Sequence, residues 1–184
     1  MPAVIHPVLA VLAEQWRSLG PQIAALERQI LAWHNSNADS LRLATIPQFG
    51  PIVSSALLAT AGAAQRFDSG RQFAAWVGLV PAQNSTLGLQ PTGLSRGGKE
   101  RLGGITKAGD RYLRQLLVIA ATGMIRRVRA KPESSAWFAR LLGRMPPRKA
   151  TVALANKMAR IAWALLAKQT TYRAPPSIAA VPAA

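Results

Sequence analysis

Cysteine is missing from this chain of 184 residues. Its absence excludes disulfide bonds, catalysis by a thiolate and zinc sites built from cysteine. Histidine is almost as scarce, because the chain has only His6 and His34. The two lie far apart in the sequence with no carboxylate cluster near them, so we predict no histidine-based metal site.

Acidic residues are also few, since seven Asp and Glu stand against 23 Lys and Arg. They are scattered singly along the chain: Glu14, Glu27, Asp39, Asp68, Glu100, Asp110 and Glu133. Metal-dependent hydrolysis or strand transfer needs several carboxylates that converge on the metal ions. We therefore predict that this chain holds no metal and no complete two-metal nuclease site. A Ser-His-Asp arrangement is equally poorly supported, because no histidine lies near the serine-rich segment.

The sequence has no unbroken apolar run long enough to cross a bilayer. Residues 43–65 are uncharged, but Pro47, Gly50 and Pro51 leave too short a helix for about 30 Å of hydrocarbon. The N-terminus has no basic region before its apolar residues, and Glu14 interrupts them, which argues against a secretory signal. We expect a cytoplasmic protein with no membrane partner.

Positive charge is what the chain has in excess, and most of it lies in one half. The formal net charge is +16. Residues 1–95 hold five Lys and Arg against four Asp and Glu, whereas residues 96–184 hold eighteen against three. This balance predicts an anionic partner, and nucleic acid is the first candidate. On charge alone a ribosomal-type or membrane-surface role stays open.

Apolar residues recur every three or four positions over most of the chain, which predicts an all-α fold. The predicted helices cover residues 7–34, 72–77, 110–129, 134–143 and 150–169, with a helix, turn and helix over 41–62. We find no convincing strand. We divide the chain into coiled-coil-like linker helices over 1–36, a helical domain over 37–172 and a disordered Ala/Pro-rich tail over 173–184.

The N-terminal segment carries an amphipathic stripe over residues 7–34. Gly20 and Pro21 interrupt the stripe, so we expect either two helices or one kinked helix. Such a stripe needs a partner. It can pack on the rest of this chain, or it can pair between chains as a coiled coil.

Residues 41–62 have the outline of a helix-hairpin-helix element. Pro51 stands in the first turn of the second helix, where its missing N–H costs nothing. In such an element the turn amides, here around Gly50, can point at a DNA phosphate. Gln48 departs from the pattern, because a second hairpin glycine is expected there. An ordinary helical corner that packs Ile46, Ile52, Leu57 and Leu58 explains the pattern as well.

A long segment rich in Gly, Ser, Thr, Pro, Gln and Asn spans residues 82–104. Loops of this length are uncommon inside compact domains and are usually functional or disordered. The segment holds Ser85 and Ser95 among basic residues. A serine hydroxyl that attacks a phosphodiester needs such cations around the phosphoryl oxygens. We therefore treat both serines as candidate nucleophiles, although loop serines are more often turn formers.

Basic residues around this segment and at the ends of the later helices are candidate contacts to nucleic-acid phosphates. With Gly50 of the hairpin, the predicted set is Arg71, Arg96, Lys99, Arg101, Lys107, Arg111, Arg114, Arg126, Arg127 and Lys149. If about six phosphates are neutralised, the logarithm of the binding constant should fall with the logarithm of the salt concentration at a slope near −5.

Two stretches of the chain resemble a known family. Residues 73–86 read Phe-Ala-Ala-Trp-Val-Gly-Leu-Val-Pro-Ala-Gln-Asn-Ser-Thr, and residues 97–107 read Gly-Gly-Lys-Glu-Arg-Leu-Gly-Gly-Ile-Thr-Lys. They are similar to the C-terminal domain of Piv/MooV-type insertion-sequence transposases, the IS-one-ten family. The turn over residues 46–52 and the stretch over 110–114 fit the same pattern. The resemblance covers roughly residues 20–170.

The resemblance implies a transposase C-terminal helical domain that supplies a serine nucleophile for DNA recombination. In that family an N-terminal RuvC-like domain supplies four acidic ligands for Mg²⁺. A helical coiled-coil segment links the two domains, and residues 7–34 would be its end. The enzymes act as oligomers, and some are guided by a non-coding RNA from the element. The implied partners are DNA, an element-encoded guide RNA and, through residues 7–34, a second copy or an intact transposase.

Two departures from the family pattern shape our interpretation. The acidic domain is absent, so we expect a truncated transposase that is inactive on its own. Family members run Ser-[Ser/Thr]-Gly-Gly-Lys without interruption, whereas residues 87–96 separate Ser85-Thr86 from Gly97 here. Alignment from the upstream side makes Ser85 the nucleophile, which we prefer, and alignment from the downstream side makes it Ser95.

Two other functions stay open at this point. One is a non-catalytic DNA- or RNA-binding module that pairs with or modulates intact transposases. The other is a helix-hairpin-helix repair or ribosome-associated protein, which would require the match over residues 97–107 to be accidental.

Overall fold

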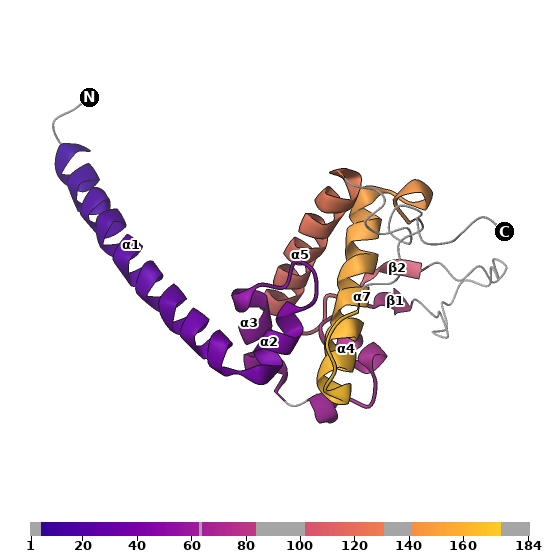
Figure 1. The fold of residues 1–184 in the computed structure, drawn as a ribbon. Helices are drawn as coiled ribbons and strands as arrows, with labels where there is room; N and C mark the ends of the chain where they lie inside the picture. The colour runs from indigo at the N-terminus through magenta and orange to yellow at the C-terminus, as the bar shows by residue number, and fades with distance from the viewer. Residues whose placement is uncertain (1–4, 63, 84–101, 131–140, 174–184) are drawn as a thin grey trace, which may run out of the picture.

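The computed structural model describes residues 5–62, 64–83, 102–130 and 141–173. Its elements are α1 (Ile5–Ser36), α2 (Ala38–Ala44), α3 (Pro51–Ala61), η1 (Ala64–Arg66), α4 (Gly70–Trp76), β1 (Pro81–Gln83), β2 (Leu102–Ile105), α5 (Arg111–Ala130) and α7 (Pro147–Lys168). Helices make up nearly all regular structure in this described part, so the predicted all-α class is confirmed (Figure 1).

Helices α5 and α7 form the centre of the fold and run in opposite directions beside one another (Figure 1). Helices α2 and α4 pack on α7, and α3 packs on α5. The buried apolar faces form one core, whose largest fully buried side chains include Phe73, Leu43, Leu57, Leu79, Leu113, Leu117, Val77 and Val128. Apolar residues spaced for one helix face therefore meet in a single interior, as the periodicity predicts.

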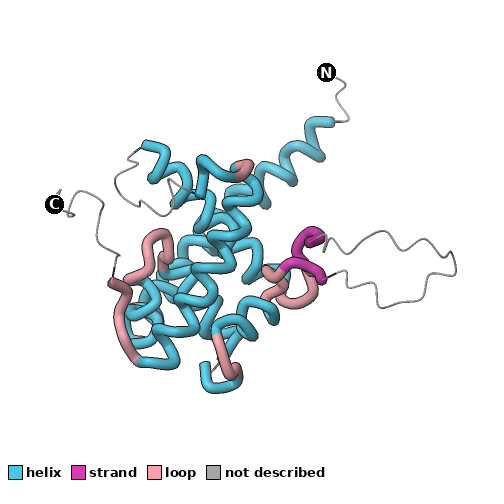
Figure 2. Tube along the Cα trace, turned by 90° about the vertical axis from the view of Figure 1, so that its right-hand side faces the viewer, coloured by secondary structure: helices cyan, strands magenta, loops and turns pink. Residues whose placement is uncertain are grey.

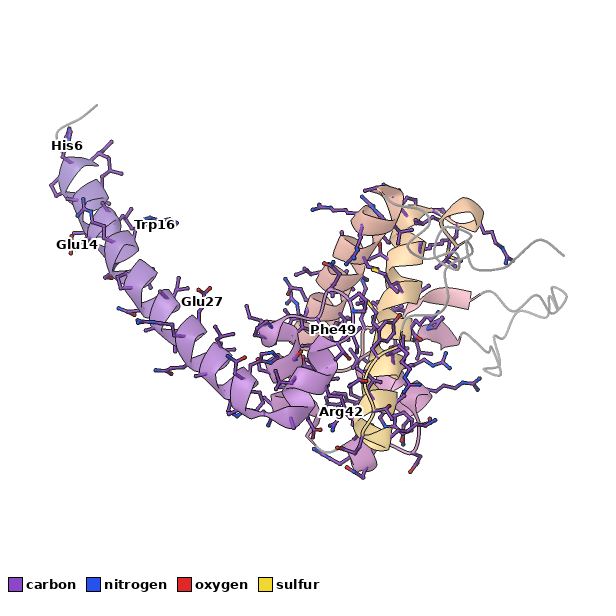
Figure 3. The ribbon with its side chains drawn as sticks, in the orientation of Figure 1. His6, Glu14, Trp16, Glu27, Arg42 and Phe49 are labelled. Carbon is purple, nitrogen blue, oxygen red and sulfur yellow. The ribbon has the colours of Figure 1, made fainter. Side chains whose placement is uncertain are left out.

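Helix α1 is one continuous helix with Pro21 inside it, which decides between the two forms left open by the sequence. It extends away from the body of the molecule, and Trp16 projects from it into solvent (Figure 3). Trp16 is 80% exposed and Leu12 is 54% exposed. His34 is the buried residue of this helix. Packing on the rest of this chain is therefore confined to the C-terminal end of α1, where it meets α2 and α3.

A buried polar pair joins α1 to α2. The Nδ1 atom of His34 lies 2.6 Å from Oγ of Ser40. Asn37 separates the two helices, and its side chain accepts a hydrogen bond of 2.9 Å from the Ser40 N–H. Asn37 is therefore the N-cap of α2, and His34 and Ser40 are both hydrogen-bonded where the two helices meet.

The prediction that the chain has no strand is wrong. Strands β1 and β2 pair as a two-stranded antiparallel sheet at the margin of the helical body (Figure 2). Each strand is only three or four residues long, and Pro81, Gly103 and Gly104 are weak strand formers. Pairing across the intervening residues 84–101 stabilises them, and no local pattern in the sequence reports such pairing.

Two further predictions fall partly or wholly outside the described residues. Of the helix predicted over 134–143, only residues 141–143 are described, and they are helical. The predicted tail lies outside them from residue 174 onward. Over the ranges that are described, no helix is both long enough and apolar enough to span a membrane.

Candidate nucleic-acid interface

The two flanks of the segment that carries the candidate serines meet in the β1–β2 pair. Pro81 lies opposite Ile105, and Gln83 lies opposite Leu102. The predicted residues between the strands are Ser85, Ser95, Arg96, Lys99 and Arg101, and they lie outside the described residues. Their roles stay predictions.

Backbone hydrogen bonds tie these flanks to the end of α4. The Thr106 N–H donates to the Val80 carbonyl over 2.9 Å, and the Lys107 N–H donates to the Gly78 carbonyl over 3.3 Å. Gly78 has φ of 80° and Gly109 has φ of 113°. Glycine adopts these values without the steric conflict that a Cβ brings. The start of α5 and the end of α4 thus form one close-fitting junction.

Arg114 is part of this junction. Its Nη1 atom donates a hydrogen bond of 3.0 Å to the carbonyl of Val77, just beyond the last residue of α4. The side chain is half-buried. Arg114 therefore stabilises the end of α4, and its predicted contact with nucleic acid stays a prediction.

Lys107 and Arg111 lie exposed on either side of the N-cap of α5. The cap itself is Asp110, whose Oδ1 accepts a hydrogen bond of 2.6 Å from the Leu113 N–H. The exposed cations on either side of this cap, Lys107 and Arg111, are charged groups that a phosphate can reach.

The turn between α2 and α3 contains a residue with left-handed backbone conformation, and this residue is not a glycine. Gln48 has φ of 72°, although a glycine was expected at this position. Gly50 is the N-cap of α3 in an extended conformation that any residue can adopt. Ile46 and Leu57 are buried and Leu58 packs against the core, as an ordinary helical corner requires, whereas Ile52 is 47% exposed. The contact between the turn amides and a DNA phosphate stays a prediction.

The hairpin turn rests on the middle of α5. A Cβ added to Gly123 would lie 2.5 Å from Oε1 of Gln48, so the missing side chain makes room for this glutamine. Gln48 and Arg126 line the same hollow of about 400 Å³. The structure thus brings the turn that contains Gly50 close to one predicted phosphate contact, Arg126.

The C-terminal end of α5 and the N-terminal end of α7 lie together at the top of Figure 1 and are strongly basic. The exposed cations there are Arg126, Arg127, Arg129, Arg144, Arg148 and Lys149, and we call this set the distal basic end. The antiparallel packing of α5 and α7 explains why residues from two separate sequence stretches meet. Arg126, Arg127 and Lys149 are predicted contacts, and the structure adds the other three.

Few of the cations in the described ranges are neutralised by ion pairs. The ion pairs found in those ranges join Arg17 to Glu14 at 2.9 Å and Arg42 to Asp39. Neither involves a cation of the distal basic end. Concentrated positive charge of this kind attracts polyanions over the whole end of the molecule.

The described part of the chain has no group of three or more His, Asp or Glu residues that could hold a metal ion. We therefore assign no metal ligand among these residues.

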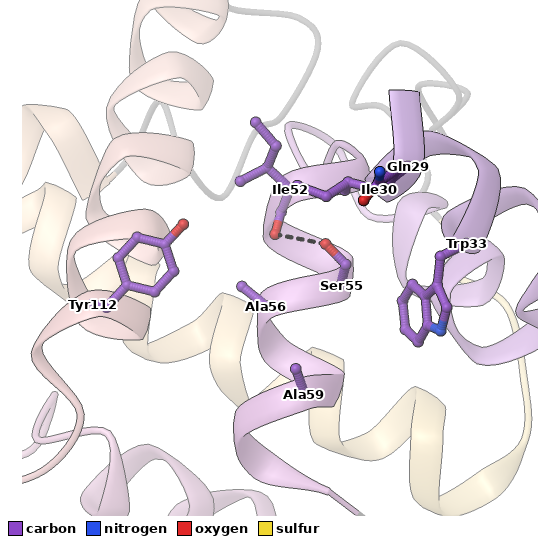
Figure 4. Close-up of a pocket in the computed structure, with 8 residues that line it drawn as sticks. All are labelled: Gln29, Ile30, Trp33, Ile52, Ser55, Ala56, Ala59 and Tyr112. Carbon is purple, nitrogen blue, oxygen red and sulfur yellow. Dashed lines mark hydrogen bonds between the residues drawn. The ribbon is translucent and has the colours of Figure 1, made fainter. Parts of the chain in front are cut away.

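The molecule also exposes an apolar surface, separate from the basic one. Leu19, Ile23 and Leu26 of α1 are each about half exposed, at 49%, 54% and 59%. Near the body, Ile30 and Trp33 of α1 join residues of α3 and Tyr112 of α5 around an apolar hollow of about 420 Å³ (Figure 4). The stripe of α1 therefore continues onto the folded body.

The chain also matches a known protein family. Residues 40–139 match the family described as "Transposase IS116/IS110/IS902 family". The chain belongs to this transposase family. The insertion-sequence family expected from residues 73–86 and 97–107 is thereby confirmed, whereas the Piv/MooV-type serine chemistry stays a prediction.

Three relatives are transposases by name. A probable family 20 transposase of Pseudomonas aeruginosa is 45% identical over 174 residues, which are 94% of this chain and 48% of that protein. The transposase for insertion sequence element IS1111A of Coxiella burnetii is 38% identical, over 82% of this chain and 39% of that protein. The transposase for IS1328 of Yersinia enterocolitica is 35% identical, over 94% of this chain and 49% of that protein. The chain thus spans about half the length of these relatives or less.

The family match contains both candidate serines and most of the predicted cations of this transposase chain, but α1 and α7 lie outside it. Two cations on α7, Lys157 and Arg160, were not among the predicted contacts. Their spacing of eight and eleven residues from Lys149 places all three on one side of a helix, and that spacing was the available signal.

Proposed function

We propose that this chain is the C-terminal, DNA-binding part of an insertion-sequence transposase and that it carries the serine nucleophile of DNA recombination. The observation that supports the binding role best is the distal basic end. Six exposed cations gather there, five from α5 and α7 and Arg144 from the segment just before α7, and neither ion pair found in the described ranges involves one of them. Duplex DNA presents a dense array of phosphates to such a surface.

The proposed chemistry is nucleophilic attack on a DNA phosphodiester. The Oγ of Ser85, or of Ser95 in the other alignment, forms a bond to phosphorus. The bond from phosphorus to the DNA leaving oxygen breaks, and that oxygen takes up a proton. Nearby cations would stabilise charge on the phosphoryl oxygens. The Mg²⁺ ligands that the family uses would come from a separate RuvC-like domain, so the proposal makes this chain inactive alone.

A salt titration tests the binding role. We expect the logarithm of the DNA-binding constant to fall with the logarithm of the salt concentration at a slope near −5, corresponding to about six phosphate contacts. The triple variant Arg126→Ala, Arg127→Ala, Lys149→Ala should lower the steepness of this slope by about three. A slope near zero for the unmodified chain would refute the proposal.

The serine role needs a separate test. The chain is mixed with DNA and with an intact acidic domain supplied in trans, and covalent protein–DNA adducts are resolved on denaturing gels. Loss of the adduct in Ser85→Ala with retention in Ser95→Ala identifies Ser85, and the opposite pattern identifies Ser95. An adduct that survives in both variants refutes the role of both serines. No adduct with the unmodified chain favours a non-catalytic module that binds DNA or RNA.

We further propose that residues 7–34 pair with a second copy or with an intact transposase. The exposed apolar stripe of α1 and its continuation into the hollow of Figure 4 support this pairing. Burial of such side chains stabilises an interface by about 25 cal/mol per Å². The double variant Leu19→Arg, Ile23→Arg should shift the mass measured by light scattering to that of a monomer. Light scattering of the unmodified chain mixed with RNA from the element tests whether a guide RNA binds.

A further inference from the structure

A second basic feature lies away from the distal basic end, in a groove between α4 and α7. The groove has a volume of about 890 Å³ and is open along one side. Arg71 enters it from α4, and Asn156, Lys157 and Arg160 enter it from α7. Trp163 and small or apolar residues form the rest of its wall.

The close approach of the two helices builds this groove. A Cβ added to Gly70 would lie 3.1 Å from the backbone oxygen of Arg160, which is tight for a side-chain atom. Glycine at this point therefore lets the start of α4 rest directly on the backbone of α7. Trp163 stabilises the same region, since its Nε1 donates hydrogen bonds to the carbonyls of Ala64 and Phe67 at 3.0 and 3.2 Å.

The charge of the groove has one sign. Its lining contains three cations and no carboxylate. Arg71 and Arg160 are exposed, and neither takes part in the ion pairs found in the described ranges. Burial lowers the pKa of Lys157, and the charge of Arg160 lowers it further. Cations that disfavour one another in a half-buried place are stabilised when an anion enters.

The cations of the groove come from two helices. Lys157 and Arg160 line it from α7, and Arg71 lines it from α4. Lys149 lies on the same side of α7, but it belongs to the distal basic end and does not line the groove. A groove of about 890 Å³ has room for more than one phosphate group, so a chain of phosphates can contact cations from both helices.

We propose that the groove between α4 and α7 binds the sugar–phosphate backbone of a nucleic-acid strand, with Arg71, Lys157 and Arg160 contacting its phosphates. This site rests on the proposed function, since it assumes that the chain binds nucleic acid, but it is distinct from the distal basic end. Asn156 stays a wall residue, because its Nδ2 donates to the Leu79 carbonyl at 3.1 Å.

The first experiment compares two double variants that remove the same charge. Arg71→Ala, Arg160→Ala changes the groove, and Lys168→Ala, Arg173→Ala changes exposed cations at and after the C-terminal end of α7, which do not line it. Binding of single-stranded DNA, duplex DNA and RNA is measured between about 0.05 and about 0.3 M salt, because charge screening strengthens over this range. The groove variant should bind at least one of these about tenfold more weakly and lower the salt slope by about two. The control variant should match the unmodified chain.

The nucleic acid most affected identifies the strand that occupies the groove. If the groove variant matches the unmodified chain on all three, the groove proposal is overturned, while the proposed function stands on the distal basic end. If the unmodified chain binds none of them, both proposals fail. Circular dichroism of each variant checks folding, and Lys157→Met provides a second variant that keeps both exposed arginines.

Protection of Lys157 gives an independent measurement. The chain is treated with an amine-acylating reagent, and modification of each lysine is followed by mass spectrometry. A bound oligonucleotide should slow acylation of Lys157 more than that of Lys168 at the end of α7. Inorganic phosphate at the same phosphate concentration should not. Equal protection by phosphate would make the groove a small-anion site and would overturn the claim that it binds a strand.

Discussion

Substitution of Gly109 by alanine tests the junction between α4 and α5 most directly. Gly109 has φ of 113°, and a Cβ placed on it would overlap the carbonyl oxygen of Trp76. The same junction contains Gly78, which is held in a similar way against Ala108. The variant therefore has to shift the backbone that carries β1 and β2.

The magnitude follows from two costs and one offset. A side chain in a left-handed conformation costs about 1 to 2 kcal/mol, and forcing an extra carbon into a packed site costs about 1 to 3 kcal/mol. Alanine also restricts the unfolded chain, which offsets about 0.4 to 1 kcal/mol. The net loss in the free energy of unfolding is about 1 to 4.6 kcal/mol, which lowers Tm by about 2 to 18 °C for a chain of this size.

Thermal unfolding followed by circular dichroism measures this loss. Gly104→Ala is the matched control, because Gly104 lies in the neighbouring strand with no atom within 4 Å of an added Cβ and without a positive φ. The control should stay within about 0.5 kcal/mol of the unmodified chain. Equal Tm values for the two variants would refute the geometry described for this junction.

Three further predictions concern single polar groups. Asn156→Ala removes the hydrogen bond to Leu79, so urea unfolding should show a loss of about 1 kcal/mol. Ser40→Ala leaves His34 buried without its partner, and the expected loss is about 1 to 3 kcal/mol; an unchanged unfolding midpoint would contradict the pairing. The pKa of Lys157 is lowered from its ordinary value of 10.5, so the native state releases this proton at lower pH than the unfolded chain does. The free energy of unfolding should therefore rise with pH on approach to 10.5 by an amount that Lys157→Met abolishes.

The helices were predictable because their signal is local. The apolar spacing around Leu113 and Leu117 predicts α5 to within one residue at each end, since the burial of one helix face dictates that spacing. Helix α7 begins three residues before the predicted start at residue 150, because Pro147 fits the first helical position, where its missing N–H costs nothing. Of the two forms expected around Pro21, two helices or one kinked helix, the structure excludes the first, because α1 continues through Pro21.

The strands and the groove were not predictable in the same way. Pro81 and Ile105 meet only because α4 and α5 hold both flanks of residues 84–101 together. Arg71 and Arg160 lie far apart in the sequence, and their juxtaposition depends on the contact at Gly70. Gln48 shows the converse case, in which the backbone adopts a positive φ without the glycine that the pattern expects.

The sequence by itself determined the helical class, the excess of positive charge in residues 96–184 and the transposase resemblance, because each depends on residue type and short-range spacing. Only the tertiary structure decided which cations gather. Antiparallel packing of α5 on α7 builds the distal basic end, and the seating of α4 on α7 forms the groove. It also left the apolar stripe of α1 without cover from the described body. These outcomes depend on contacts between distant segments, which burial of a shared core selects and no local pattern encodes.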